Sequence, residues 1–177
     1  MKTKRITLCA LFIASALILH LVESALPPLF AFAPGAKMGL SNLVTLLAVF
    51  ILGVPESYLV LVVRCVLGSV FGGNLFSLVY SLPAGVIALT VEIVLIKFAL
   101  GKLSVVSVSF IGAVLHNAVQ LAVASIIVKV NLMPYLPVML FASCVAGLVV
   151  GFVAYFTLKY LPQSVYIREQ SSQTKSE

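Results

Sequence analysis

Residues 34–42 read PGAKMGLSN, and they separate two strongly apolar stretches, VESALPPLFAFA at 22–33 and LVTLLAVFIL at 43–52. The chain as a whole is also apolar: 62% of its 177 residues are hydrophobic, 9% are charged and the mean hydropathy is +1.22. A soluble domain of this size cannot hide so much apolar surface. The composition therefore predicts an all-α integral membrane protein in which most side chains face lipid.

The apolar segments predict a bundle of six transmembrane helices in one domain, residues 1–162, followed by a polar cytoplasmic tail at 163–177. The expected spans lie at about 6–24, 38–53, 56–72, 76–97, 104–129 and 133–160. A bilayer core of about 30 Å needs about 20 helical residues, so the second segment is short for a span. We expect it to begin inside a cavity lined by protein rather than in lipid.

The basic residues predict the orientation in the membrane. With the N-terminus in the cytoplasm, eight lysines and arginines face the cytoplasm, and only Lys37 and Lys129 face the outside. This bias follows the positive-inside rule and predicts a multi-pass protein of the cytoplasmic membrane with both termini inside. The first segment is interpreted as a span and not as a signal peptide, because further apolar segments follow it. Basic residues spread between apolar runs also argue against nucleic-acid binding.

The cysteines give no prediction of a metal or a cofactor. Cys9, Cys65 and Cys144 all lie inside apolar runs and lack CxxC spacing. We interpret them as small apolar packing residues, so neither metal nor cofactor is expected.

Polar side chains at membrane depth are costly and therefore point to function. Counting about 1.5 Å per helical residue from the predicted span ends places nine of them in the outer half or at the middle of the bilayer. They predict a pocket open to the outside, with these candidate substrate-binding residues: His20, Glu23, Lys37, Asn42, Arg64, Asn74, His116, Asn117 and Gln120. Glu92 falls toward the cytoplasm by the same count, where a structural pairing with Lys97 or Lys102 is expected.

Arg64 and Lys37 indicate the charge of the ligand. An arginine inside a span cannot lose its proton, so Arg64 needs a carboxylate, with Glu23 the best placed, or an anionic ligand. Lys37 precedes the second helix, whose N-terminus already carries positive potential, and Gly35 and Gly39 allow close approach to the backbone. The alternative for Lys37 is contact with lipid headgroups.

Two pairs of polar residues each share a helix face. His20 and Glu23 are three residues apart, and His116 and Gln120 are four apart. Hydrogen bonds that hold the helices together are the alternative to ligand binding in both cases.

The sequence around the first helix resembles a known class of membrane subunit. Ala10-Leu-Phe-Ile-Ala14 is a small-xxx-small motif, which allows close approach of another helix, in a partner or within the bundle. Six helices, cytoplasmic termini and this alanine pair resemble the substrate-capture (S) components of energy-coupling factor transporters. In that class the pair faces the transmembrane coupling subunit, which implies a docking role for Ala10 and Ala14.

Three further motifs are similar to one branch of that class: PGAKMGLSNLVTL at 34–46, RCVLGSVFGGN at 64–74 and HNAVQ at 116–120. The branch is the Gx transporter family, also described as heptaprenyl diphosphate synthase component I. The transporter name implies capture of a small, anionic metabolite from outside and docking on a coupling subunit with cytoplasmic ATPases. The synthase name implies an accessory membrane subunit beside a soluble prenyl diphosphate synthase in isoprenoid-quinone biosynthesis.

The residues present favour a role without catalysis. The chain has no aspartate and no paired glutamates, whereas magnesium–diphosphate sites need clustered carboxylates. It also lacks a Walker A loop, so ATP hydrolysis would come from a partner. We therefore expect that the chain is not itself an enzyme; a membrane scaffold with purely structural polar residues remains a third hypothesis.

Overall fold

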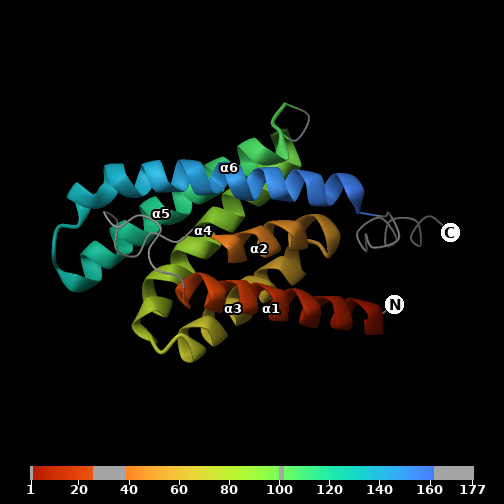
Figure 1. The fold of residues 1–177 in the computed structure, drawn as a ribbon, viewed down its shortest axis with the longest axis horizontal. Helices are drawn as coiled ribbons and strands as arrows, with labels where there is room; N and C mark the ends of the chain where they lie inside the picture. The colour runs from red at the N-terminus through yellow and green to blue at the C-terminus, as the bar shows by residue number, and fades with distance from the viewer. Residues whose placement is uncertain (1, 26–38, 100–101, 162–177) are drawn as a thin grey trace.

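The computed structural model describes residues 2–25, 39–99 and 102–161. Within these ranges every regular element is helical, which confirms the all-α class (Figure 1). The elements are α1 (Lys2–Ala25), α2 (Leu40–Ile51), α3 (Val54–Phe71), α4 (Phe76–Ala99), α5 (Val105–Val128), the 3₁₀ turn η1 (Met133–Tyr135) and α6 (Leu136–Tyr160). Lys37 and Gly35, on which part of the predicted anion site depends, lie outside the described residues.

Local sequence explains where these helices begin. Gly39 precedes α2 with φ +71°, and Gly53 precedes α3 with φ +118°; glycine adopts both conformations without the strain of a Cβ atom. Pro55 occupies the first turn of α3, where its missing N–H is not needed. Ser104 caps α5 by accepting a hydrogen bond from the backbone N–H of Ser107 at 3.2 Å.

Five helices, α1, α3, α4, α5 and α6, are long and apolar enough to cross a membrane, so the chain is a multi-pass membrane protein. The sixth, α2, has 12 residues, which gives about 18 Å against a bilayer core of about 30 Å. Eight of its side chains are buried, and it contacts α1, α3, α4 and α6. The short second segment is therefore an internal helix, enclosed largely by protein.

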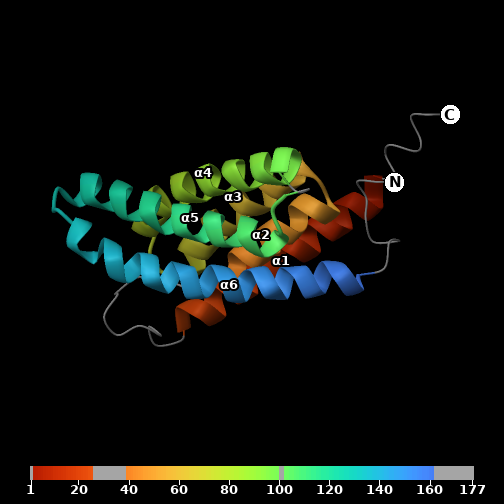
Figure 2. The same cartoon turned by 90° about the horizontal axis from the view of Figure 1, so that it is seen from above.

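Successive helices run in opposite directions, so their ends gather in two groups (Figures 1 and 2). The start of α1 and the end of α6 lie at one end of the bundle. An ion pair at that end joins Arg5 of α1 to Glu56 in the first turn of α3, at 3.6 Å. The end of α1 and the starts of α2, α4 and α6 lie at the other end. Helices α4 and α5 run obliquely to α1 and α6 (Figure 1).

The packed core lies around α2. Leu46, Val49 and Leu52 from this segment pack with Val60 and Leu61 of α3, and all five side chains are almost completely buried. Many large apolar side chains on α1, α4, α5 and α6 are instead exposed, as expected for surfaces that meet lipid acyl chains.

Candidate ligand-binding cavity

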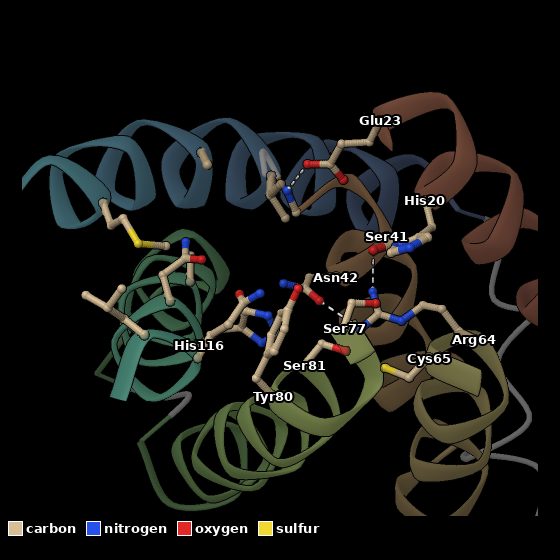
Figure 3. Close-up of a pocket in the computed structure, with 18 of the residues that line it drawn as sticks. His20, Glu23, Ser41, Asn42, Arg64, Cys65, Ser77, Tyr80, Ser81 and His116 are labelled. Atoms are coloured by element: carbon tan, nitrogen blue, oxygen red, sulfur yellow. Dashed lines mark hydrogen bonds between the residues drawn. The ribbon is translucent and has the colours of Figure 1, made fainter. Parts of the chain in front are cut away.

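A cavity of about 290 Å³ lies among the helices, and its lining includes residues at the end of α1 and at the starts of α2 and α4 (Figure 3). Its volume is close to the lower limit for small-molecule sites, about 300–1,000 Å³. All six α-helices contribute to its lining. The polar side chains that line it are His20, Glu23, Ser41, Asn42, Arg64, Ser69, Ser77, Tyr80, Ser81, Glu92, Ser109, His116, Asn117 and Gln120.

The lining includes seven of the nine candidate residues. Side chains that were selected by their depth along separate helices therefore meet in one cavity. They meet because neighbouring antiparallel helices bring residues of similar depth to the same level of the bundle. Of the other two, Lys37 lies outside the described residues. Asn74 lies elsewhere in the structure, as described below.

Arg64 lies in the middle of α3 and is only 4% exposed. Its guanidinium donates one hydrogen bond to the hydroxyl of Ser41 and another to Oδ1 of Asn42, at 3.0 Å. Both acceptors are neutral. Its Nε atom is buried and has no hydrogen-bond acceptor within the described part of the chain. Ser41 and Asn42 therefore orient the guanidinium without neutralising its charge.

Glu23 contacts the start of α2. Its Oε1 atom accepts a hydrogen bond from the backbone N–H of Gly39 at 2.6 Å, and the side chain is 8% exposed. A carboxylate at a helix N-terminus is stabilised by the free N–H groups and by the helix dipole. The sequence predicted that free N–H groups at the start of α2 bind an external anion. In the structure the N–H of Gly39 instead donates to the carboxylate of Glu23.

On α5, His116, Asn117 and Gln120 all line the cavity; a shared helix face was predicted for His116 and Gln120. The Nδ1 atom of His116 is buried without a hydrogen-bond partner among the described residues. Asn117 differs, because its amide nitrogen donates to the hydroxyl of Ser143 on α6 at 2.7 Å. Asn117 thus makes the kind of interhelical hydrogen bond that was the alternative considered for His116 and Gln120.

The prediction that Glu92 stands apart from the cavity is wrong. The side chain is buried, at 8% exposure, and it lines the cavity. It packs against α5 so closely that a Cβ atom on Gly112 would lie 1.8 Å from its Oε1 atom. Of the two expected partners, Lys97 is exposed and lies over the ring of Phe98, and Lys102 is also exposed. Counting depth did not predict that the cavity extends along α4 as far as Glu92.

Arg64, Glu92 and His116 all line this cavity. In Figure 3, Arg64 and His116 lie on opposite sides of the cavity, with Asn42 and Tyr80 between them. The cavity thus combines a fixed positive charge with acidic, amide and imidazole groups. Such a lining can bind a small molecule through an anionic group and further hydrogen bonds.

Asn74 does not line the cavity, so its predicted place there is corrected. It is exposed, and its Oδ1 atom accepts the backbone N–H of Ser77 at 3.2 Å, while the Ser77 hydroxyl donates to the Asn74 carbonyl at 2.7 Å. These bonds satisfy donors at the start of α4, as expected for a helix cap. The depth of Asn74 did not reveal this role, because a polar residue just before a helix can bond to the backbone at the start of that helix.

The sequence reasoning also missed a row of hydroxyl groups on α4. Ser77, Tyr80 and Ser81 all line the cavity. Their spacing of three and four residues was the available signal, because it places them on one helix face. Hydroxyls are inexpensive in membrane helices, so they were not considered as candidates.

The two alanines of the small-xxx-small motif are exposed on α1. With Ile6 and Ile18 they form a row at steps of four residues, here called the alanine stripe, whose isoleucines are 70% and 60% exposed. Small residues on α6 behave differently: a Cβ atom on Gly147 would lie 2.9 Å from the Cα atom of Phe110 on α5. Gly147 of α6 therefore packs inside the bundle, whereas the alanine stripe faces outward.

Comparison with known proteins places the chain in a family. No curated protein and no solved structure matches it. A family model matches residues 12–157, which extend from within α1 to within α6. The chain therefore belongs to the family described as heptaprenyl diphosphate synthase component I.

Proposed function

We propose that the chain is a membrane-embedded substrate-capture subunit that binds a small anionic metabolite in the cavity and docks on an ATP-driven coupling module. The observation that carries this proposal is Arg64, a buried and permanently charged side chain whose two side-chain hydrogen bonds go to neutral groups. Taking a guanidinium out of water is costly unless an opposite charge accompanies it. An anionic group of a ligand would supply that charge and match the guanidinium geometry.

The neighbouring groups support the same assignment. The start of α2 lines the cavity, and Asn42, which helps to hold the guanidinium, belongs to its first turn. His116, Gln120 and Tyr80 line the remaining surface and can orient other polar groups of the ligand.

The alanine stripe supports docking on a partner within the membrane. Small side chains flanked by exposed isoleucines allow another helix to approach closely. Ala10 and Ala14 precede His20 and Glu23 along α1, and none of the four stripe residues lines the cavity. With the N-terminus in the cytoplasm, as the basic residues predict, the cavity would open to the outside and the stripe would lie near the cytoplasmic ATPases.

A second candidate function rests on the name of the matched family. The chain would then be an accessory membrane subunit beside a soluble prenyl diphosphate synthase, in the synthesis of isoprenoid quinones. The absence of aspartate from the sequence means that the soluble partner would carry the magnesium–diphosphate chemistry.

Native mass spectrometry of the detergent-purified protein tests the capture function. We expect a small anionic molecule to co-purify with the wild-type protein, and Arg64→Gln to weaken its retention. Loss of a hydrogen bond to a charged group costs about 1.5–3 kcal/mol, which corresponds to about 10–150-fold in affinity. Arg5→Gln is the matched control, because Arg5 pairs with Glu56 outside the cavity.

The same preparations separate the two functions. An empty cavity in every preparation, together with faster prenyl-chain elongation by the soluble synthase when the chain is added, would favour the accessory subunit. Equal retention by the Arg64→Gln and Arg5→Gln variants would remove Arg64 from the binding role.

A further inference from the structure

The cavity has walls of opposite character. Arg64, Ser41 and Asn42 form a polar wall on α3 and α2. The lining from the second half of α5, from the connection that follows it and from α6 is largely apolar, and it includes Leu121, Ala124, Leu132, Met139, Ala146 and Val150. A ligand that fills the cavity must satisfy both walls at once.

We propose that the ligand is an amphipathic anion, with a carboxylate or phosphate at one end and a compact apolar body at the other. This proposal rests on the proposed capture function and narrows its substrate class. The anionic end binds at Arg64. The apolar body packs against Leu121, Leu132 and Met139.

The apolar wall is a structural unit of its own. Leu121 is 5% exposed and Met139 is 7% exposed, and they pack with Leu132 and Leu136 in a cluster separate from the main core. Ala124, one turn beyond Leu121 on α5, also lines the cavity, and its small side chain leaves room beside the cluster. Apolar lining with a few placed polar groups is the usual composition of a small-molecule site.

The polar wall cannot accept the apolar body. An apolar group placed against the Arg64 guanidinium would remove water from its charge without supplying a counter-charge, which is costly. The orientation of the ligand is therefore fixed by the two walls. Figure 3 shows Arg64 on the side of the cavity opposite α5, where His116 lies, so a ligand bound to both walls extends across the cavity.

The test measures how affinity depends on the apolar length of simple anions. Wild-type protein in phosphatidylcholine nanodiscs is titrated by calorimetry with methyl, ethyl, propyl and butyl phosphate, and separately with acetate through pentanoate. Burying one methylene group is worth about fourfold in affinity. We expect the dissociation constant to fall with each added methylene, by up to about 60-fold from methyl to butyl. The series that binds more tightly identifies the anionic group.

Met139→Gln tests the position of the apolar body. This change keeps the side-chain length and places an amide in the apolar wall, so it should flatten the chain-length dependence. Met133→Gln is the matched control, because Met133 is 44% exposed and does not line the cavity. Anions that bind with no dependence on chain length would overturn the amphipathic class and leave anion capture intact. Failure of both series to bind would remove the capture function together with this inference.

Discussion

Replacing Gly112 by alanine tests the placement of Glu92 in the cavity. A Cβ atom at position 112 would lie 1.8 Å from Oε1 of Glu92, 2.6 Å from its Cδ and 2.8 Å from its Cγ, all inside the 3.0 Å that real Cβ contacts keep. The Glu92 side chain must therefore leave its position. Overpacking of this kind costs about 1–3 kcal/mol, so Gly112→Ala should lower the free energy of unfolding by that amount.

A double-mutant cycle isolates the contact. In a Glu92→Ala background the clashing atoms are absent, and alanine has a higher helix propensity than glycine by up to about 1 kcal/mol. Gly112→Ala should therefore be neutral or stabilising there, so that the effect changes sign between the two backgrounds. The free energies are measured by reversible unfolding in mixed micelles, followed by circular dichroism.

An equal loss of stability in both backgrounds would refute the reasoning. It would show that Glu92 does not pack on α5, and would restore the hypothesis that Glu92 pairs with Lys97 or Lys102. A ligand-affinity measurement on Gly112→Ala adds a second readout, because the displaced carboxylate must move within the cavity lining.

Two further predictions concern the docking surface and the cap of α4. Ala10→Leu with Ala14→Leu should abolish co-purification of a coupling subunit without changing ligand affinity, because larger side chains keep the partner helix away. Val149→Leu, on the exposed side of α6, is the control. Unchanged recovery of the subunit with the double alanine variant would exclude the docking role. Asn74→Ala should cost about 1 kcal/mol of stability through loss of the cap and leave ligand affinity unchanged. Weaker binding with unaltered stability would instead support a ligand contact for Asn74.

Much of the fold follows from the sequence for a simple physical reason. Lipid cannot satisfy backbone polar groups, so spanning segments must be long, apolar and helical, and glycine or proline marks their ends. The segment predicted at 76–97 is α4, Phe76–Ala99, and that at 104–129 is α5, Val105–Val128. The short segment at 38–53 is α2, and its prediction as an element beginning at a protein-lined cavity is confirmed by Gly39, Ser41 and Asn42 in the lining.

The candidate site was only partly predictable. His20, Arg64 and His116 were identified because unusual residue types in an apolar run are visible without a structure. Glu92 was not a candidate because the depth to which a cavity extends depends on tertiary packing, which a count along one helix does not contain. The hydrogen bonds of Arg64 with Ser41 and Asn42 were also not foreseen, since a serine beside an asparagine at a helix start equally suggests a cap.

Because α2 is short, a count of long apolar helices leaves it out, and this changes the side of the membrane on which each chain end is expected. A count based on length and hydropathy finds five crossings, and an odd number would put the two chain ends on opposite sides of the bilayer. In the structure the start of α1 and the end of α6 lie at the same end of the bundle (Figure 1). The buried α2 helix supplies the sixth pass along the bundle and makes the number of passes even, because it leads the chain back toward the ion pair between Arg5 and Glu56. Reporter domains fused to the two ends should therefore report the same compartment, although hydropathy alone assigns them to different ones.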